Sequence, residues 1–131
     1  MEDRPSIELF AIGTELVLGR VQDTNSFWIA QQIAQMGGEL RRITVLIDSL
    51  EEIVEALRSA LARGTRFLIT TGGLGPTPDD LTVEAVAQLV GCKTVLHEPT
   101  LERYLQRRGL ARTVQVLGLS AQRGHAPVRT A

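Results

Sequence analysis

The chain has 131 residues, of which 44% are hydrophobic and 22% are charged, and its formal net charge is −1. These values indicate one globular domain and argue against disorder or a positive field that would attract nucleic acid. No apolar run approaches the roughly 18 residues of a membrane-spanning helix, and the acidic start lacks the layout of a secretory signal. A single cysteine, Cys92, excludes an intramolecular disulfide, so we expect a cytoplasmic protein.

Short apolar segments alternate with amphipathic ones up to residue 108. The sequence predicts strands at residues 7–12, 40–47, 66–71 and 92–96. It predicts helices at residues 24–36, from a Ser49 cap to Gly64, from about Thr77 or Pro78 to Val90, and at 99–108. This order is typical of a three-layer α/β/α fold with a mainly parallel sheet.

The segment after the third predicted strand is rich in glycine. Ligands bind beyond the carboxyl ends of parallel strands, and glycines let a backbone approach a phosphate that a helix N-terminus also attracts. An ordinary strand-to-helix turn, with Thr77 as the cap and Pro78 following it, is the alternative. The residues we expect to bind phosphate here are Thr71, Gly72, Gly73, Gly75, Pro76 and Thr77.

Two acidic residues, Asp79 and Asp80, follow this glycine loop. Bare carboxylates would repel a phosphate. A divalent cation bound between the carboxylates and the phosphate would remove this repulsion. The alternative interpretation is that these two acids only stabilise the N-terminus of a helix.

The loops after the first two strands carry further candidates. Gly13, Thr14 and Glu15 follow the first strand, but they match neither a dinucleotide fingerprint nor a Walker A motif. Asn25 begins the next helix, where it is a ligand-binding or a capping residue. Asp48 follows the second strand. It is either a metal ligand or simply the residue that precedes the Ser49 cap, and the spacing alone favours neither interpretation.

The motifs together resemble a known family. Residues 11–19 (AIGTELVLG), 23–25 (DTN) and 71–82 (TGGLGPTPDDLT) closely resemble the N-terminal domain of the competence/damage-inducible CinA proteins. That domain belongs to the molybdopterin-binding group that includes MogA and MoaB. The resemblance runs from about residue 7 to residue 109 and implies a three-layer α/β domain that often forms homo-oligomers.

The resemblance also implies chemistry. CinA-type domains are associated with metal-dependent hydrolysis of the ADP-ribose pyrophosphate, and molybdopterin-binding relatives hold a pterin phosphate. Asp48 and Asp80 match the two aspartates of that group, so we expect both to be catalytic and to bind a divalent metal, Mg²⁺. Glu15 is the expected base, because it lies on the adjacent loop. The expected partner is a nucleotide or pterin phosphate, and no nucleic acid or membrane is expected.

The last 22 or so residues depart from the family pattern. All 15 acidic residues precede Gly109, whereas residues 110–131 carry three arginines and lack the family's later loop. We therefore predict a domain at residues 1–109, incomplete at its C-terminal end through truncation or a shifted reading frame, and a divergent basic tail at 110–131. The leading hypothesis is an ADP-ribose pyrophosphatase-type hydrolase; the alternatives are a non-catalytic binding module and an inactive remnant.

Overall fold

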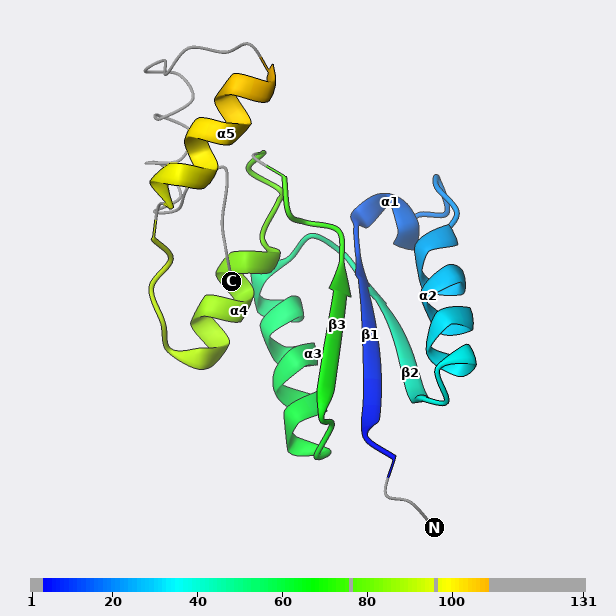
Figure 1. Ribbon diagram of the computed structural model, residues 1–131. Coiled ribbons are helices and arrows are strands. Elements are labelled where there is room, and N and C mark those ends of the chain that lie inside the picture. The colour runs from blue at the N-terminus through cyan, green and yellow to red at the C-terminus, as the bar shows by residue number, and fades with distance from the viewer. Residues whose placement is uncertain (1–3, 76, 96, 109–131) are drawn as a thin grey trace.

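The computed structural model describes residues 4–75, 77–95 and 97–108, and a parallel sheet lies at its centre. Within that part of the chain the sheet has three strands, β1 (Ser6–Ile12), β2 (Glu39–Leu46) and β3 (Phe67–Thr71). The strand order is β2-β1-β3, and both pairings of β1 are parallel. The three carboxyl ends therefore lie at one edge of the sheet (Figure 1).

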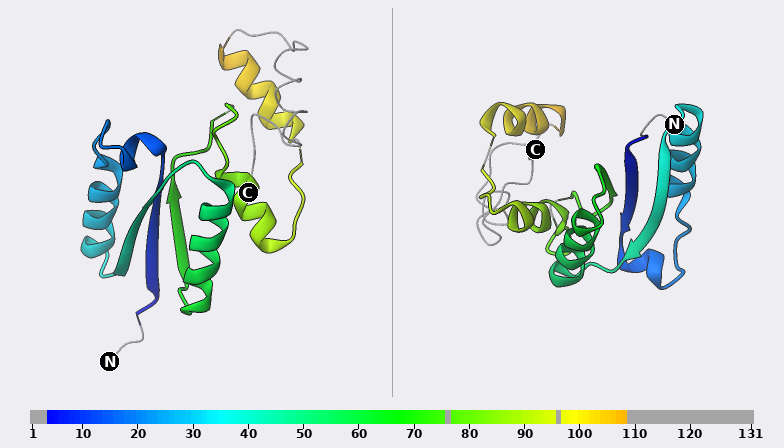
Figure 2. Two further views of the ribbon diagram at one scale, coloured as in Figure 1. Left: turned by 180° about the vertical axis from the view of Figure 1, so that it is seen from behind. Right: turned by 90° about the horizontal axis from the view of Figure 1, so that it is seen from below.

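Helices cover both faces of this sheet, which confirms the predicted α/β architecture. A single-turn helix, α1 (Thr14–Val17), follows β1, and α2 (Thr24–Gln35) then lies on one face. On the other face α3 (Leu50–Ala62) packs beside α4 (Thr82–Val90). A last helix, α5 (Glu98–Arg108), lies beyond α4, away from the sheet (Figure 2).

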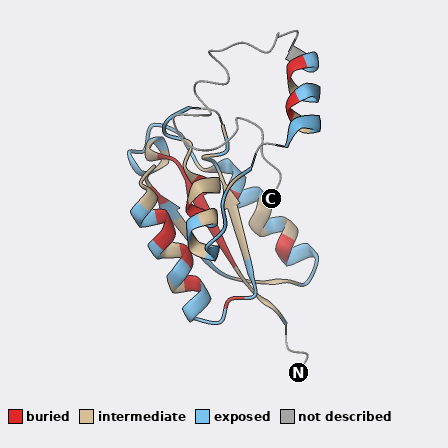
Figure 3. Cartoon of the chain, turned by 90° about the vertical axis from the view of Figure 1, so that its left-hand side faces the viewer, coloured by how far each residue is buried: buried red, intermediate tan, exposed pale blue. Residues whose placement is uncertain are grey.

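The core fills mainly the side of the sheet that faces α3 and α4. Phe10 and Ile12 of β1 meet Ile53 and Leu57 of α3, and each of these side chains is almost fully buried. Buried and exposed residues alternate along α3 in Figure 3, because this amphipathic helix turns one stripe inward. On the opposite face of the sheet, Ile33 of α2 is buried.

Most predicted helices and strands are present, with boundaries shifted by a residue or two. Asp23 is the cap of α2, since its carboxylate accepts the Ser26 N–H at 3.1 Å. Ser49 caps α3 through a long contact of 3.5 Å from the Glu52 N–H. The one-turn helix α1 was not predicted, because four residues are too few to show helical periodicity.

Two sequence predictions are wrong. The third long helix begins at Thr82 rather than at Thr77 or Pro78, because residues 77–80 close a separate turn in which the Asp80 N–H donates to the Thr77 carbonyl at 3.0 Å. Residues 92–95 form no strand, although Val95 and its neighbours favour one; a strand requires a neighbour to pair with. The predicted boundary at residue 109 and the tail at 110–131 lie outside the described residues.

A buried acid anchors the amino end of the sheet. Glu8 of β1 accepts two hydrogen bonds from Arg63, at 3.0 and 2.7 Å, and a third from the Thr65 hydroxyl at 2.6 Å. These bonds, chiefly those from Arg63, hold the pKa of Glu8 below its ordinary value despite the opposing effect of burial. Arg63 caps α3 and Thr65 precedes β3, so one carboxylate joins β1 to the turn between these two elements.

Replacing Glu8 with glutamine removes this charge, and we expect the free energy of unfolding at pH 7 to fall by about 1–3 kcal/mol. Because the folded-state pKa is the lower one, the ionised carboxylate stabilises the fold fully above its unfolded pKa of about 4.3. That stabilisation is lost as the pH falls through the folded pKa, so the two proteins should converge in acid. Urea unfolding followed by circular dichroism across this pH range measures both effects.

Glu55→Gln is the matched control, because Glu55 pairs with Arg58 at 3.4 Å on the exposed side of α3. An exposed pair of this kind contributes little, so the control should change stability by less than about 0.5 kcal/mol. A Glu8→Gln deficit that stays constant down to the acid transition would contradict the ionic origin of the effect.

Candidate functional site: a pocket at the carboxyl edge of the sheet

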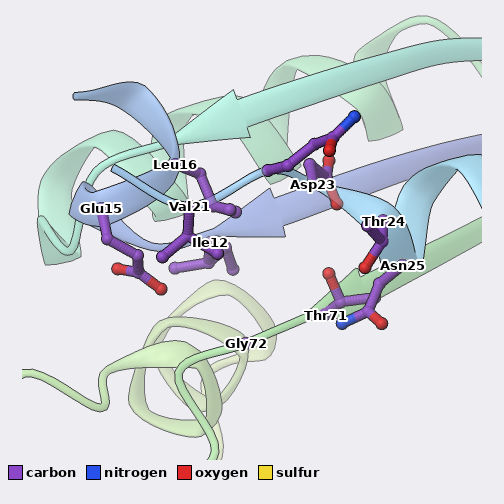
Figure 4. Close-up of a pocket in the computed structure, with 10 residues that line it drawn as sticks. Ile12, Glu15, Leu16, Val21, Asp23, Thr24, Asn25, Thr71 and Gly72 are labelled. Atoms are coloured by element: carbon purple, nitrogen blue, oxygen red, sulfur yellow. The ribbon is translucent and has the colours of Figure 1, made fainter. Parts of the chain in front are cut away.

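A pocket of about 180 Å³ opens where the ends of β1 and β3 meet the start of α2. Figure 4 shows side chains from these three places around it. The lining consists of Ile12, Glu15, Leu16, Val21, Gln22, Asp23, Thr24, Asn25, Thr71 and Gly72. Such a position, beyond the carboxyl ends of parallel strands, is where α/β sheets bind small molecules.

Glu15 contributes an acid to the pocket from α1. Its carboxylate folds back over Gly13, so that a Cβ placed on Gly13 would lie 2.6 Å from Glu15 Oε1. The Gly13 N–H meanwhile donates to the Leu46 carbonyl at 2.9 Å, which continues the β1–β2 pairing past the end of β1. Gly13 thus leaves the space that the Glu15 carboxylate occupies.

Two reciprocal hydrogen bonds join the loop after β1 to the loop after β2. The Thr14 N–H donates to Asp48 Oδ2 at 2.9 Å, and the Asp48 N–H donates to the Thr14 hydroxyl at 3.0 Å. Asp48 therefore satisfies an N–H at the start of α1, a helix that has no side-chain cap of its own. This contact supports the interpretation of Asp48 as a structural residue, and its predicted metal role stays a prediction.

The first turn of α2 forms the opposite wall. The Asp23 cap fixes the chain at the point where Thr24 and Asn25 enter the pocket lining. Thr71 and Gly72, at the end of β3, complete the wall (Figure 4). Hydroxyl and amide groups from two distant segments thus converge here with the Glu15 carboxylate, a combination of donors and acceptors suited to a polar ligand.

The glycine loop is pressed closely against its neighbours. Gly72 and Gly73 both have positive φ, of 86° and 66°. A Cβ on Gly72 would overlap the Ile12 carbonyl, and one on Gly73 would overlap the Thr82 hydroxyl. Thr82, which is buried, donates that hydroxyl to the Gly72 carbonyl at 2.8 Å. The glycines are therefore needed first for the packing of the loop against β1 and α4.

The far end of the loop is closed by Asp80. Its Oδ2 accepts the Thr77 N–H at 2.9 Å and the Thr77 hydroxyl at 2.7 Å. A Cβ on Gly75 would lie 2.7 Å from the same oxygen. A phosphate bound by the Thr77 amide would displace one of these contacts, so the predicted phosphate seat requires the loop to rearrange locally.

The structure brings only some of the predicted site residues into the pocket. Glu15, Asn25, Thr71 and Gly72 line it. Gly13 and Thr14 lie at the start of α1, and Asp48 is hydrogen-bonded to Thr14 there. The other described members of the set belong to the rest of the glycine loop: Gly73, Gly75, Thr77, Asp79 and Asp80. Pro76 lies outside the described residues.

The described part of the chain holds no group of three or more acidic, histidine or cysteine side chains placed to bind a metal. Asp48 and Asp80 do accept hydrogen bonds, yet a carboxylate has about four lone-pair sites, so these bonds do not exclude a cation. Mg²⁺ commonly binds through one or two carboxylates together with the phosphates of its ligand. The donor set is thus compatible with Mg²⁺ that arrives with a phosphate-bearing molecule.

Thr82 is a residue whose role the sequence analysis missed. Its hydroxyl and the bond from its N–H to the Gly73 carbonyl, at 3.2 Å, fasten the glycine turn to the start of α4. No sequence signal marks it, because a threonine at a helix start is normally assigned to capping.

We expect Thr82→Val to lower the free energy of unfolding by about 1–3 kcal/mol, since the Gly72 carbonyl would lose its buried donor. Thr82→Ser keeps the hydroxyl and should retain most of the stability. Chemical denaturation of the three proteins under one condition measures the difference. A serine variant that is less stable than the valine variant would assign the effect to packing of the methyl group instead.

The fold is that of an α/β domain with a pocket at the carboxyl edge of its sheet. A family described as a probable molybdopterin binding domain matches residues 8–128. The chain belongs to this MogA/MoaB-like family, and the resemblance stated from its motifs is confirmed.

Two similar proteins show how much of a relative this chain covers. A CinA-like protein of Kosmotoga olearia is 45% identical over 95 residues, which cover 72% of this chain and 23% of that protein. A protein of Aeropyrum pernix is 40% identical over 116 residues, 86% of this chain and 43% of its own length. The chain thus spans less than half the length of these relatives.

Solved structures agree with this fold. The CinA protein of Thermoplasma acidophilum, of unknown function, matches with a TM-score of 0.78 and 32% identity over 85% of this chain and 65% of that one. The molybdopterin biosynthesis enzyme MoaB of Thermus thermophilus matches with a TM-score of 0.61 and 27% identity, covering 64% and 54%. No helix in the described ranges has the length and apolar character needed to cross a membrane.

Proposed function

We propose that this chain binds a nucleotide or pterin phosphate at the carboxyl edge of its sheet and hydrolyses the pyrophosphate of an ADP-ribose-type nucleotide. The observation that carries the proposal is the pocket in which Glu15, Asn25 and Thr71 converge. Membership of a family of probable molybdopterin-binding domains supports a small phosphorylated ligand. The choice of a nucleotide rests on the association of CinA-type domains with ADP-ribose hydrolysis, and this chain is similar to CinA-like proteins.

In this proposal the pocket and the glycine loop bind different parts of the ligand. A cavity of about 180 Å³ is small, so it suits one polar moiety of the ligand rather than a whole dinucleotide. The Gly72 turn adjoins it and leads to the Thr77 amide and hydroxyl, which would exchange their bonds to Asp80 for bonds to phosphate oxygens. Asn25 and Thr71 would then orient the attached sugar or ring through hydrogen bonds.

Hydrolysis requires the acids of the site to bind a metal ion and to accept a proton. Asp80 and Asp48 would hold the Mg²⁺, which when bound offsets the charge that builds on the leaving phosphate. Glu15 would accept a proton from the attacking water, whose oxygen forms the new bond to phosphorus as the bridging P–O bond breaks. AMP and ribose 5-phosphate would leave as the products of ADP-ribose.

Incubation of the purified chain with ADP-ribose and Mg²⁺, followed by ion-exchange chromatography, tests this reaction. We expect AMP to accumulate and a chelator to abolish its formation. Absence of AMP in a chain that unfolds cooperatively would overturn the hydrolytic proposal.

Asp80→Asn should lower the rate of AMP formation by about 10- to 100-fold, because the amide keeps the loop contact with Thr77 but binds a cation poorly. Glu55→Gln, on the far side of α3, should leave the rate unchanged. Full activity of Asp80→Asn would contradict the metal role of this residue.

A non-catalytic binding module is the second candidate. It is favoured by the loop bonds that Asp48 and Asp80 already make and by the lack of a larger acidic cluster in the described ranges. Thermal denaturation with AMP, ADP-ribose or a pterin phosphate separates the two candidates. A melting temperature that rises with ligand, without turnover, assigns the chain to this second class.

A further inference from the structure

The pocket at the start of α2 is acidic. Among the residues that line it, Glu15 and Asp23 carry carboxylates, and none of the lining residues is a lysine, an arginine or a histidine. Both acids are drawn among the lining side chains in Figure 4. A phosphate inside this pocket would face two like charges without a countercharge. The part of a ligand that enters the pocket is therefore not its anionic part.

The amino end of α2 does not supply the missing positive charge. A helix N-terminus attracts anions through its free N–H groups. Here the Asp23 carboxylate already occupies that end of the helix, since its Oδ1 accepts the Ser26 N–H at 3.1 Å. The negative cap offsets the partial positive charge of the helix. A phosphate attached to the bound group would therefore stay outside the pocket, on the side of the Gly72 turn.

Asp23 is able to accept a further hydrogen bond while it caps α2. A carboxylate has about four lone-pair sites, and the Ser26 N–H uses one of them. Asp23 is half-buried and lines the pocket, so a bound molecule can reach the remaining sites. The cap bond also holds the side chain in one orientation, which reduces the entropy lost when a ligand binds to it.

The other lining residues favour a sugar over an aromatic ring. None of them is aromatic, although proteins commonly bind flat rings by stacking them on aromatic side chains. A sugar ring instead has C–H groups that pack against aliphatic side chains, and hydroxyls that both donate and accept hydrogen bonds. The amide of Asn25 and the hydroxyl of Thr71 also offer donors and acceptors. The aliphatic lining residues are Ile12, Leu16 and Val21.

We propose that Asp23 is a specificity residue, which selects a phosphorylated ligand whose pentose carries vicinal 2- and 3-hydroxyls. The pentose lies in the pocket and these hydroxyls donate to the Asp23 carboxylate, while the phosphate lies outside, toward the glycine loop. An acidic side chain binds a ribose hydroxyl in the same manner in dinucleotide-binding α/β folds. The inference rests on the proposed function for the phosphate of the ligand, and it leaves the proposed base, Glu15, free for the attacking water.

Isothermal titration calorimetry on the full chain tests the inference with sugar phosphates, which contain no pyrophosphate to cleave. The probes are ribose 5-phosphate with its 2-deoxy analogue, and AMP with its 2′-deoxy analogue. In at least one pair we expect the deoxy compound to bind at least about tenfold more weakly, because Asp23 loses a hydrogen bond to it. Discrimination in the first pair assigns the pocket to the terminal pentose of an ADP-ribose-type ligand, and discrimination in the second assigns it to the pentose of the nucleoside.

Asp23→Ser is the variant that separates selection from folding. Serine caps a helix about as well as aspartate but lacks the second carboxylate oxygen, so circular dichroism should show native helix content. We expect this variant to bind the hydroxylated probe about tenfold more weakly and to bind both compounds of the pair equally. A purely structural role of Asp23 would weaken both compounds alike and leave their ratio unchanged.

Glu55→Gln is the matched control for the loss of a negative charge, because Glu55 lies on the exposed side of α3. It should leave both affinities as they are in the wild-type chain. Equal affinities within both pairs in the wild-type chain overturn the inference, and so does a failure of all four probes to bind. A preference that persists in Asp23→Ser, or that Glu55→Gln reduces equally, overturns it as well.

These outcomes are distinguishable from a failure of the hydrolytic proposal. A chain that discriminates within a pair but forms no AMP from ADP-ribose retains the sugar pocket and loses the hydrolase. A chain that forms AMP but does not discriminate retains the hydrolase, and Asp23 is then only a helix cap.

Discussion

The central position of β1 is the constraint on which the rest of the structure depends. Because β1 pairs in parallel with a neighbour on each side, every strand of the described sheet ends at the same edge. The chain must then leave that edge three times within a small space. The close contacts of Gly72 with the Ile12 carbonyl, and of Thr14 with Asp48, are the means by which these exits fit together. The pocket is the space left between these loops.

The acids of the chain illustrate how position determines role. Glu8, at the amino end of β1, is buried and fully paired with Arg63 and Thr65, and it serves the stability of the sheet. Glu15, beyond the carboxyl end of the same strand, lines a pocket instead. Asp48 and Asp80 differ from both, since each accepts hydrogen bonds that hold loops together and neither lines the pocket.

The sequence was sufficient for the order of strands and helices, because hydrophobic periodicity and caps such as Ser49 act locally. It misplaced the start of α4, since Thr77 and Pro78 carry the local signals of a helix start but enter a turn that the Asp80 side chain closes. Glycines and acids in the sequence pointed to loops that in part border the pocket, through Glu15 and Gly72. Which acid pairs with which loop could not be predicted, because Thr14 and Asp48 are 34 residues apart and only the folded sheet joins them.

The paired bonds between Thr14 and Asp48 have a consequence for local motion. Each residue offers both a backbone donor and a side-chain acceptor to the other, so neither loop can open without breaking both bonds. The turns after β1 and β2 therefore form one cooperative unit, whose amide protons exchange with solvent together rather than separately. A molecule that steadies Glu15 would in this way slow amide exchange at Asp48, in the loop after β2.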